Sequence, residues 1–283
     1  LGRARSPYRG VQMMPKVALA ALTALDLAPP ALSDVAAACG YDQVGLRLLP
    51  AMAGGLAYPL MDDEAGCKET LARLDATGIT VADLEVVAFR PETEIASFSA
   101  FFETGARLGA KNILIAGYDP DLARFTDRYA EFCAAAAPYG LTADLEFMPW
   151  THVPDLATAS KIVAQAGQAN AGILVDALHF DRSNSSTSEL ARVPVLWLHY
   201  WQLCDAPAER PATTDKMIHA ARYERLFPGD GGIDLKSLAR AMPADITISI
   251  EVPTAELAKT VDARTRAGRA LRAARGVIAA ARA

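Results

Sequence analysis

Acidic side chains stand at or near the ends of three apolar, strand-like segments of the sequence. GILVDALHF carries Asp176 after an apolar run, and His179 follows three residues later. LTADLEFMP places Glu146 near its end, and DITISIEVP ends in Glu251. In a strand, alternate residues share a face, so Ile246, Ile248 and Ile250 face away from Glu251. The isoleucines are therefore expected to pack outwards, and Glu251 is expected to point inwards.

A fourth polar side chain comes from the segment VLWLHYWQLCDAP. Its alternation places Tyr200 and Gln202 on one face and His199 on the other. Both Gln202 and His199 are therefore candidates to join the acidic residues. Carboxylates that converge repel one another unless positive charge lies between them. A divalent cation is the natural counter-charge, and oxygen donors favour Mg²⁺ or Mn²⁺, with Zn²⁺ and Co²⁺ also compatible once an imidazole takes part.

The elements that would position these side chains alternate between short β-rich runs and longer Ala/Leu-rich segments. Helix signals include Ser33 as an N-cap, Gly40 as a stop, and one long helix over 254–283. The predicted strands are Lys16–Leu22, Gln43–Leu49, Thr80–Ala88, Asn112–Ala116, Leu141–Met148, Ala171–Asp176, Val195–Leu203 and Asp245–Glu251.

Eight strands with helical connections in 283 residues predict an α/β protein formed by a single (β/α)8 TIM barrel. An open doubly wound sheet is the alternative, although no G-x-G-x-x-G follows the first strand. We expect one domain over residues 1–283, with residues 1–15 as a disordered or extended leader. In a barrel, side chains at the carboxyl ends of the strands surround the active-site mouth, so the Ser-rich segment 183–189 is expected as a loop on that face.

Composition narrows the classes of partner. The net charge is −5 and hydrophobic residues make up 52% of the chain, which argues against general binding to nucleic acid or to an anionic membrane. No apolar run is long enough to span a bilayer, and the cysteines form no C-x-x-C pair. We expect a cytoplasmic protein that acts on a small molecule, and a homodimer is compatible with the sequence.

Several motifs, in order, resemble the xylose isomerase-like TIM barrels, the superfamily of sugar phosphate isomerases and epimerases. They are YDQVGLRLLP, LEFMP, VDALHF, WQLCDAP, RLFPGDGGIDL and ISIEVP, and the resemblance extends from about Val17 to about Arg275. It implies one divalent metal held by Glu146, Asp176, Gln202 and Glu251. Many members have His at the third position, and the neutral Gln202 favours Mn²⁺ or Mg²⁺ over Zn²⁺.

The resemblance also implies roles in catalysis and substrate binding. His179 matches the histidine that contacts substrate oxygens or shuttles protons in the family. Arg47, at the end of the second strand, is a candidate to bind an anionic group of the substrate, or to form a salt bridge across the mouth. Arg225 or Arg222 is a further candidate from the segment before the PGDGG loop, and Tyr200 and Trp150 are candidates to line the pocket. Glu85 and Arg90 are weaker candidates of the same kind.

The predicted activity is that of a metal-dependent isomerase or epimerase. A metal that binds adjacent carbonyl and hydroxyl oxygens acidifies the intervening C–H, and Glu146 and Glu251 could move the proton through an enediolate. The alternative is a dehydratase of the inosose or dehydroshikimate type, in which a β-hydroxyl leaves. A non-catalytic ligand-binding barrel is a lesser alternative. An apurinic endonuclease is disfavoured because the chain has only 4 His.

Overall fold

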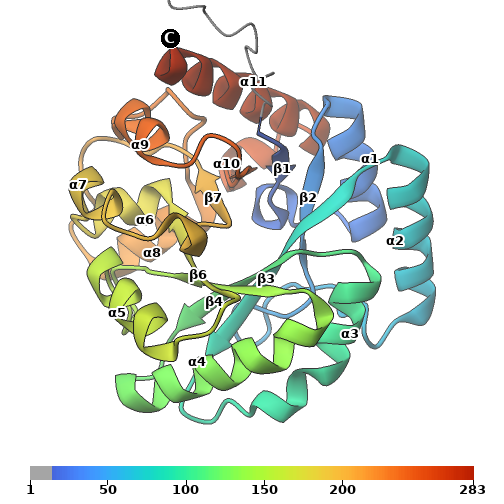
Figure 1. Cartoon of the computed structure of the whole chain (residues 1–283). Helices are drawn as coiled ribbons and strands as arrows, with labels where there is room; N and C mark the ends of the chain where they lie inside the picture. The colour runs from blue at the N-terminus through green and yellow to red at the C-terminus, as the bar shows by residue number, and fades with distance from the viewer. Residues whose placement is uncertain (1–14) are drawn as a thin grey trace, which may run out of the picture.

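The computed structural model describes residues 15–283, in which eight parallel strands close into one barrel in sequential order. The predicted (β/α)8 barrel is confirmed, and the open sheet is excluded. The leader expected at 1–15 lies outside the described residues except for its last position. Figure 1 shows the strands at the centre with helices around them. The strands are β1 (Val17–Leu19), β2 (Gln43–Arg47), β3 (Thr80–Phe89), β4 (Asn112–Gly117), β5 (Thr142–Glu146), β6 (Ala171–Asp176), β7 (Tyr200–Leu203) and β8 (Thr247–Ile250).

Helices cover the outer face of the barrel. Among the described helices, α11 is the last and longest; it packs beside α1 and α9, so the last helix lies against the first (Figure 1). The helices are α1 (Pro29–Cys39), α2 (Glu64–Thr77), α3 (Ser99–Arg107), α4 (Leu122–Ala136), α5 (Leu156–Ala166), α6 (Ala177–Arg182), α7 (Thr187–Leu190), α8 (Thr214–Tyr223), α9 (Leu235–Ala241), α10 (Ala255–Ala258) and α11 (Ala263–Arg282). Within residues 15–283, no helix is long and apolar enough to cross a membrane.

Three predictions about the elements are corrected. Ser33 lies inside α1 and donates to the Pro29 carbonyl, while the helix begins after Ala28. The helix expected over 254–283 is broken, because Asp262 accepts from Thr265 N and begins α11 as a separate helix. The seventh strand is shorter than predicted, since Val195–Trp197 forms a 3-10 turn.

The Ser-rich segment does not reach the barrel mouth. A capping box at Ser186, in which Ser186 and Glu189 bond each other's backbone N–H, begins α7. None of residues 183–189 contributes to the cavity at the carboxyl ends of the strands. The short α6 follows Asp176 directly and takes the near-mouth position instead.

The barrel interior is polar below the mouth, whereas branched apolar residues usually fill it. Asp83 is fully buried, and both its carboxylate oxygens are without a hydrogen-bond partner in the described chain. Asp144 is also buried, and its Oδ1 lies 2.6 Å from Nδ1 of His199. A Cβ on Gly172 would clash with Asp144 Oδ1 and His199 Nδ1, so the glycine makes room for this pair.

The Asp144–His199 pair is expected to make stability depend on pH. Burial lowers the pKa of His199, but Asp144 outweighs it, and the net pKa lies above the ordinary value. The pKa of a histidine in the unfolded chain is about 6.5. Because the pKa of His199 is higher in the folded protein, its pairing with Asp144 stabilises the fold fully below about pH 6.5. This stabilisation is lost as the pH rises through the pKa of the folded state. The difference in urea midpoint between wild type and His199→Asn should therefore be largest near pH 6 and should shrink towards pH 9. A difference that does not change with pH would contradict this assignment.

Candidate active site

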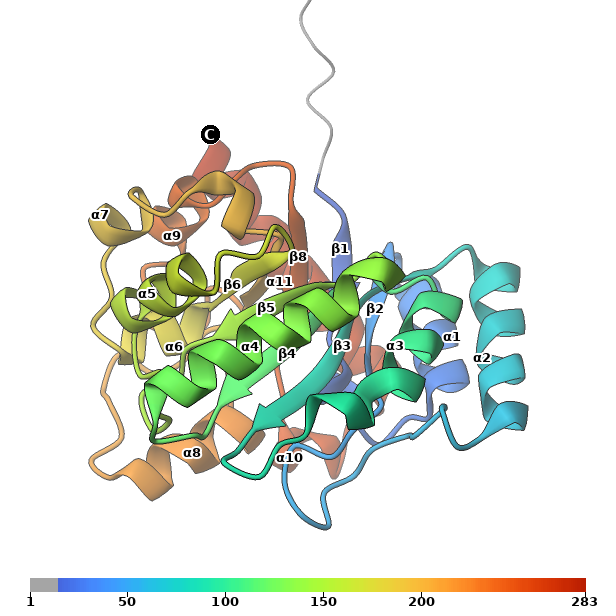
Figure 2. The same cartoon turned by 60° about the horizontal axis from the view of Figure 1, so that its bottom comes forward.

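A cavity of about 180 Å³ opens at the carboxyl ends of the strands. Figure 2 shows α8 and α10 at the end of the molecule towards which the arrowheads of β3 and β4 point. Six of the side chains predicted to carry chemistry line the cavity, namely Arg47, Glu146, His179, Arg222, Arg225 and Glu251. Active sites of TIM barrels lie at this end, so the cavity is the candidate active site.

Glu146, Asp176 and His179 form a buried cluster. One ligand atom from each lies within 4.8 Å of the other two, an arrangement that could hold a metal ion. His179 Nε2 stands 3.7 Å from Glu146 Oε1 and 3.9 Å from Asp176 Oδ1. Asp176 and His179 are brought together locally. Asp176 ends β6 and caps α6, accepting from the backbone N–H of His179 in the first turn of that helix.

Arg225 lies between two of the predicted metal ligands. Its Nη1 is 2.6 Å from Asp176 Oδ2, and its Nη2 is 2.7 Å from Glu251 Oε2. Gln202 Nε2 donates to the other oxygen of Glu251 at 3.1 Å. Asp176 and Glu251 are therefore held by donors of the protein. Glu146 differs, because within residues 15–283 its carboxylate contacts only the His179 ring among charged groups.

The site can accommodate a divalent cation. Gln202 Oε1 is buried and has no hydrogen-bond partner among the described residues, so an acceptor remains free beside the carboxylates. Among the described residues, Arg225 is the only arginine that forms an ion pair with any of the buried carboxylates Glu146, Asp176 and Glu251. Negative charge therefore exceeds positive charge here, which is the condition that a metal ion relieves.

The pKa values follow from this charge balance. Burial, with added repulsion from Asp176 and Glu251, raises the pKa of Glu146 well above its usual value. Burial also raises the pKa of Glu251 to about 7, although Arg225 opposes the shift. For Asp176, burial is outweighed by the charges of Arg225 and His179, and the pKa is lowered. Burial lowers the pKa of His179 to about 4, so its ring is neutral near pH 7.

The other predicted residues are placed as follows. Arg47 Nη2 lies 2.6 Å from Glu85 Oε2, so the salt bridge considered for Arg47 is present at the cavity wall. Tyr200 is fully buried in the barrel interior and is not among the residues that line the cavity. Trp150 lines the cavity with its ring edge-on to His179, the ring centroids being 5.0 Å apart. His199 pairs with Asp144 and is likewise not among the lining residues.

Sequence reasoning did not identify Asp205 as a structural support of the site. Its Oδ2 accepts from Gly229 N and Gly231 N at 2.9 and 3.0 Å, and its Oδ1 accepts from Ile233 N at 3.1 Å. Asp205 thereby ties the PGDGG loop to the end of β7. Backbone bonds between Asp205 and Leu226 continue this tie to the segment that carries Arg225. The only sequence signal was an acidic residue two positions after the seventh strand.

A closed (β/α)8 barrel with an acidic cluster in its mouth defines the class of the protein. The chain belongs to the xylose isomerase-like TIM barrel family, whose model matches residues 33–276. This confirms the resemblance drawn from the motifs.

Similar proteins include enzymes. Over 114 residues, 40% of this chain, the sequence is 29% identical to a 3-dehydroshikimate dehydratase of Pseudomonas aeruginosa, and this match spans 17% of that longer protein. The fold is similar to that of the IOLI protein solved with a zinc atom, with a TM-score of 0.79 at 22% identity over 94% of this chain and 98% of the other. It is also similar to a D-psicose 3-epimerase solved with D-fructose, with a TM-score of 0.71 at 14% identity over 93% and 99% of the two chains.

Proposed function

We propose that the protein is a divalent-metal-dependent isomerase or epimerase that acts on a hydroxy-carbonyl compound, such as a sugar, a sugar phosphate or a related keto compound. Glu146, Asp176, Gln202 and Glu251 would hold the metal, with Mn²⁺ or Mg²⁺ favoured by the oxygen donors. The observation that carries the proposal is the buried carboxylate cluster with its excess of negative charge and the free Gln202 Oε1.

The bound cation would supply Lewis acidity, which lowers the pKa of a C–H next to a carbonyl. Glu146 is the residue best suited to take that proton, since it faces the cavity and no hydrogen-bond donor among the described residues occupies its carboxylate. Glu251 reaches the cavity from β8 and would serve as the second base. Arg225 fixes the orientation of Glu251 and Asp176.

His179 and Arg47 would bind substrate oxygens. The pKa of His179 is lowered to about 4, so its ring is neutral near pH 7. Its Nδ1 is buried and has no hydrogen-bond partner in residues 15–283. The neutral ring can therefore form a hydrogen bond with a substrate oxygen and remain uncharged. Arg47 has a buried Nε that is likewise unpartnered in the described chain. A substrate oxygen that accepts from an unpartnered donor gains more binding free energy than a substrate oxygen that must replace an existing hydrogen bond.

The second candidate function is that of a dehydratase. It is favoured by the 29% identity to the 3-dehydroshikimate dehydratase over 114 residues. The same proton abstraction would then be followed by loss of a β-hydroxyl as water, and the site geometry is common to both reactions.

Two measurements test the proposal. Calorimetry with the purified chain should show binding of one Mn²⁺ per chain, and absence of binding would overturn the metal-dependent function. Incubation in D₂O with Mn²⁺ and a panel of ketoses, inososes and 3-keto sugars should then show deuterium incorporation at carbon. Exchange without loss of water supports the isomerase or epimerase, whereas loss of water supports the dehydratase.

A further inference from the structure

The two sides of the cavity differ in chemistry. The ionic groups that line the cavity are Arg47 at the end of β2, Glu146 at the end of β5, His179 on α6, Arg222 on α8, Arg225 before the PGDGG loop, and Glu251 after β8. The side formed by β3, β4 and the end of β5 is apolar, with Val86, Leu114, Ala116 and Met148 as its surface. These four belong to a buried apolar cluster separate from the main core of the protein.

The apolar character continues to the rim of the cavity. The large apolar side chains that are exposed in residues 15–283 are Met52, Leu56, Leu122, Val195, Leu196 and Tyr223, and half of them line this cavity. Met52 is 42% exposed, Leu56 51% and Tyr223 43%. Apolar surface of this kind, gathered around one opening, is typical of a site that removes it from water when a ligand binds.

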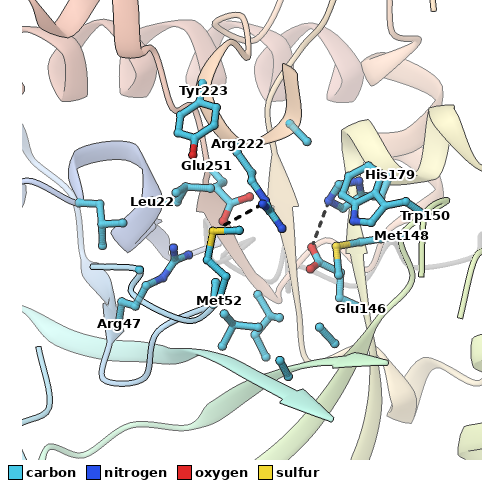
Figure 3. Close-up of a pocket in the computed structure, with 18 of the residues that line it drawn as sticks. Leu22, Arg47, Met52, Glu146, Met148, Trp150, His179, Arg222, Tyr223 and Glu251 are labelled. Carbon is cyan, nitrogen blue, oxygen red and sulfur yellow. Dashed lines mark hydrogen bonds and ion pairs between the residues drawn. The ribbon is translucent and has the colours of Figure 1, made fainter. Parts of the chain in front are cut away.

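Arg222 adds a positive charge to this apolar rim. Its Nη1 lies 3.7 Å from Met52 Sδ, and among the described residues it forms no ion pair with a carboxylate. In Figure 3, Arg222 extends into the cavity between Glu251 and Glu146. The other two arginines of the cavity, Arg47 and Arg225, are neutralised by Glu85 and by Asp176 with Glu251.

We infer that the substrate is an organic acid with a hydrocarbon body, and this inference rests on the proposed function of the same site. The carboxylate would pair with Arg222, and the apolar body would lie against Val86, Leu114 and Met148. The hydroxyl and carbonyl groups that react would face Glu146 and His179. A polyhydroxylated sugar fits this wall poorly, because its hydroxyls would lose water and find no partner on the apolar side.

The size of the cavity agrees with such a compound. Its volume is about 180 Å³, and a cavity of about 150 Å³ holds a molecule of the size of benzene. A single six-membered ring with a carboxylate can therefore be accommodated.

Three probes with the same six-membered ring separate the charge from the hydrocarbon body. They are cyclohexanecarboxylate, its uncharged amide, and quinate, which carries the same carboxylate on a polyhydroxylated ring. In calorimetry with the full chain, in EDTA and again with Mn²⁺, cyclohexanecarboxylate is expected to bind at least about tenfold more tightly than either of the others. Equal or tighter binding of quinate or of D-fructose would overturn the inference.

The Arg222→Gln variant tests the anion contact. It is expected to weaken the binding of cyclohexanecarboxylate at least about tenfold and to leave the amide unaffected. Arg269→Gln is the matched control, since Arg269 is exposed on α11 and is not among the residues of the cavity. An unchanged affinity of Arg222→Gln for the acid would overturn the role of Arg222.

These outcomes are independent of the outcome for the proposed function. Binding of the probes requires neither turnover nor metal. Selective binding of the acid without uptake of Mn²⁺ would overturn the metal-dependent function alone. Uptake of Mn²⁺ with deuterium exchange into a sugar, but no preference for the acid, would overturn the inference alone.

Discussion

Replacing Glu146 by Gln is expected to slow deuterium exchange at the substrate carbon by at least about 100-fold. A positioned general base contributes about 10²–10⁴-fold to such a step. Gln has nearly the same shape as Glu but cannot accept the proton as a base. Glu146 is buried, faces the cavity and stands 3.7 Å from the neutral ring of His179. No other residue in the described part of the cavity combines a carboxylate with the absence of an arginine or amide partner.

The experiment must separate the base from the metal ligand, because Glu146 is proposed as both. Exchange is therefore measured at a Mn²⁺ concentration that saturates each variant, as established by calorimetry. Glu256→Gln is the matched control, since Glu256 lies on α10 and pairs with Lys259 on the surface. Exchange at the wild-type rate in metal-saturated Glu146→Gln would exclude Glu146 as the base.

Replacing Arg225 by Met is expected to lower the free energy of unfolding in EDTA by about 3–5 kcal/mol, the usual cost of removing one partner of a buried ion pair. Arg225 is 4% exposed and serves both Asp176 and Glu251, so its loss leaves two buried carboxylates without their cation. Met retains much of the length and apolar surface of the arginine stem. The measurement is urea unfolding followed by circular dichroism.

Addition of Mn²⁺ makes this variant informative about the metal site as well. If the cation binds beside Asp176 and Glu251, it should stabilise Arg225→Met more than wild type, because in the variant no guanidinium competes for the same oxygens. Arg73→Met is the control. It removes an exposed pair with Asp34, which is expected to cost no more than about 1 kcal/mol. Two results would contradict the assignment. One is a loss of unfolding free energy below about 1 kcal/mol in Arg225→Met. The other is equal stabilisation of Arg225→Met and wild type by Mn²⁺.

Sequence patterns predicted the features that depend on local alternation. The limits of β6 agree with the prediction, because Gly172 to Val175 form an uninterrupted apolar run that ends at a helix-capping Asp176. The inward direction of Glu251 followed from the period of two in β8. Alternation failed in VPVLWLHYW, where Val195 and Leu196 are 66% and 83% exposed in a 3-10 turn. An apolar run alone does not reveal that exposure.

Contacts between distant segments were beyond the reach of the sequence. Arg225 contacts Asp176, 49 residues away along the chain, and the sequence pattern alone did not distinguish Arg225 from Arg222. In the structure, Arg225 is buried among the acidic groups, whereas Arg222 reaches into the cavity without a carboxylate partner within residues 15–283. Which of the two faces the acidic cluster depends on how the PGDGG loop is tied to β7 through Asp205, a tertiary contact.

The division of the cavity into an ionic side and an apolar side has an evolutionary consequence. The apolar residues Val86, Leu114 and Ala116 are carried by β3 and β4, while Asp176 and Glu251 belong to β6 and to the end of β8. Substitutions on β3 and β4 can therefore reshape the space for the substrate body without changing the strands that carry Asp176 and Glu251. A barrel built in this way can change the compounds it accepts while it retains one reaction, so related chains can diverge in substrate before they diverge in chemistry.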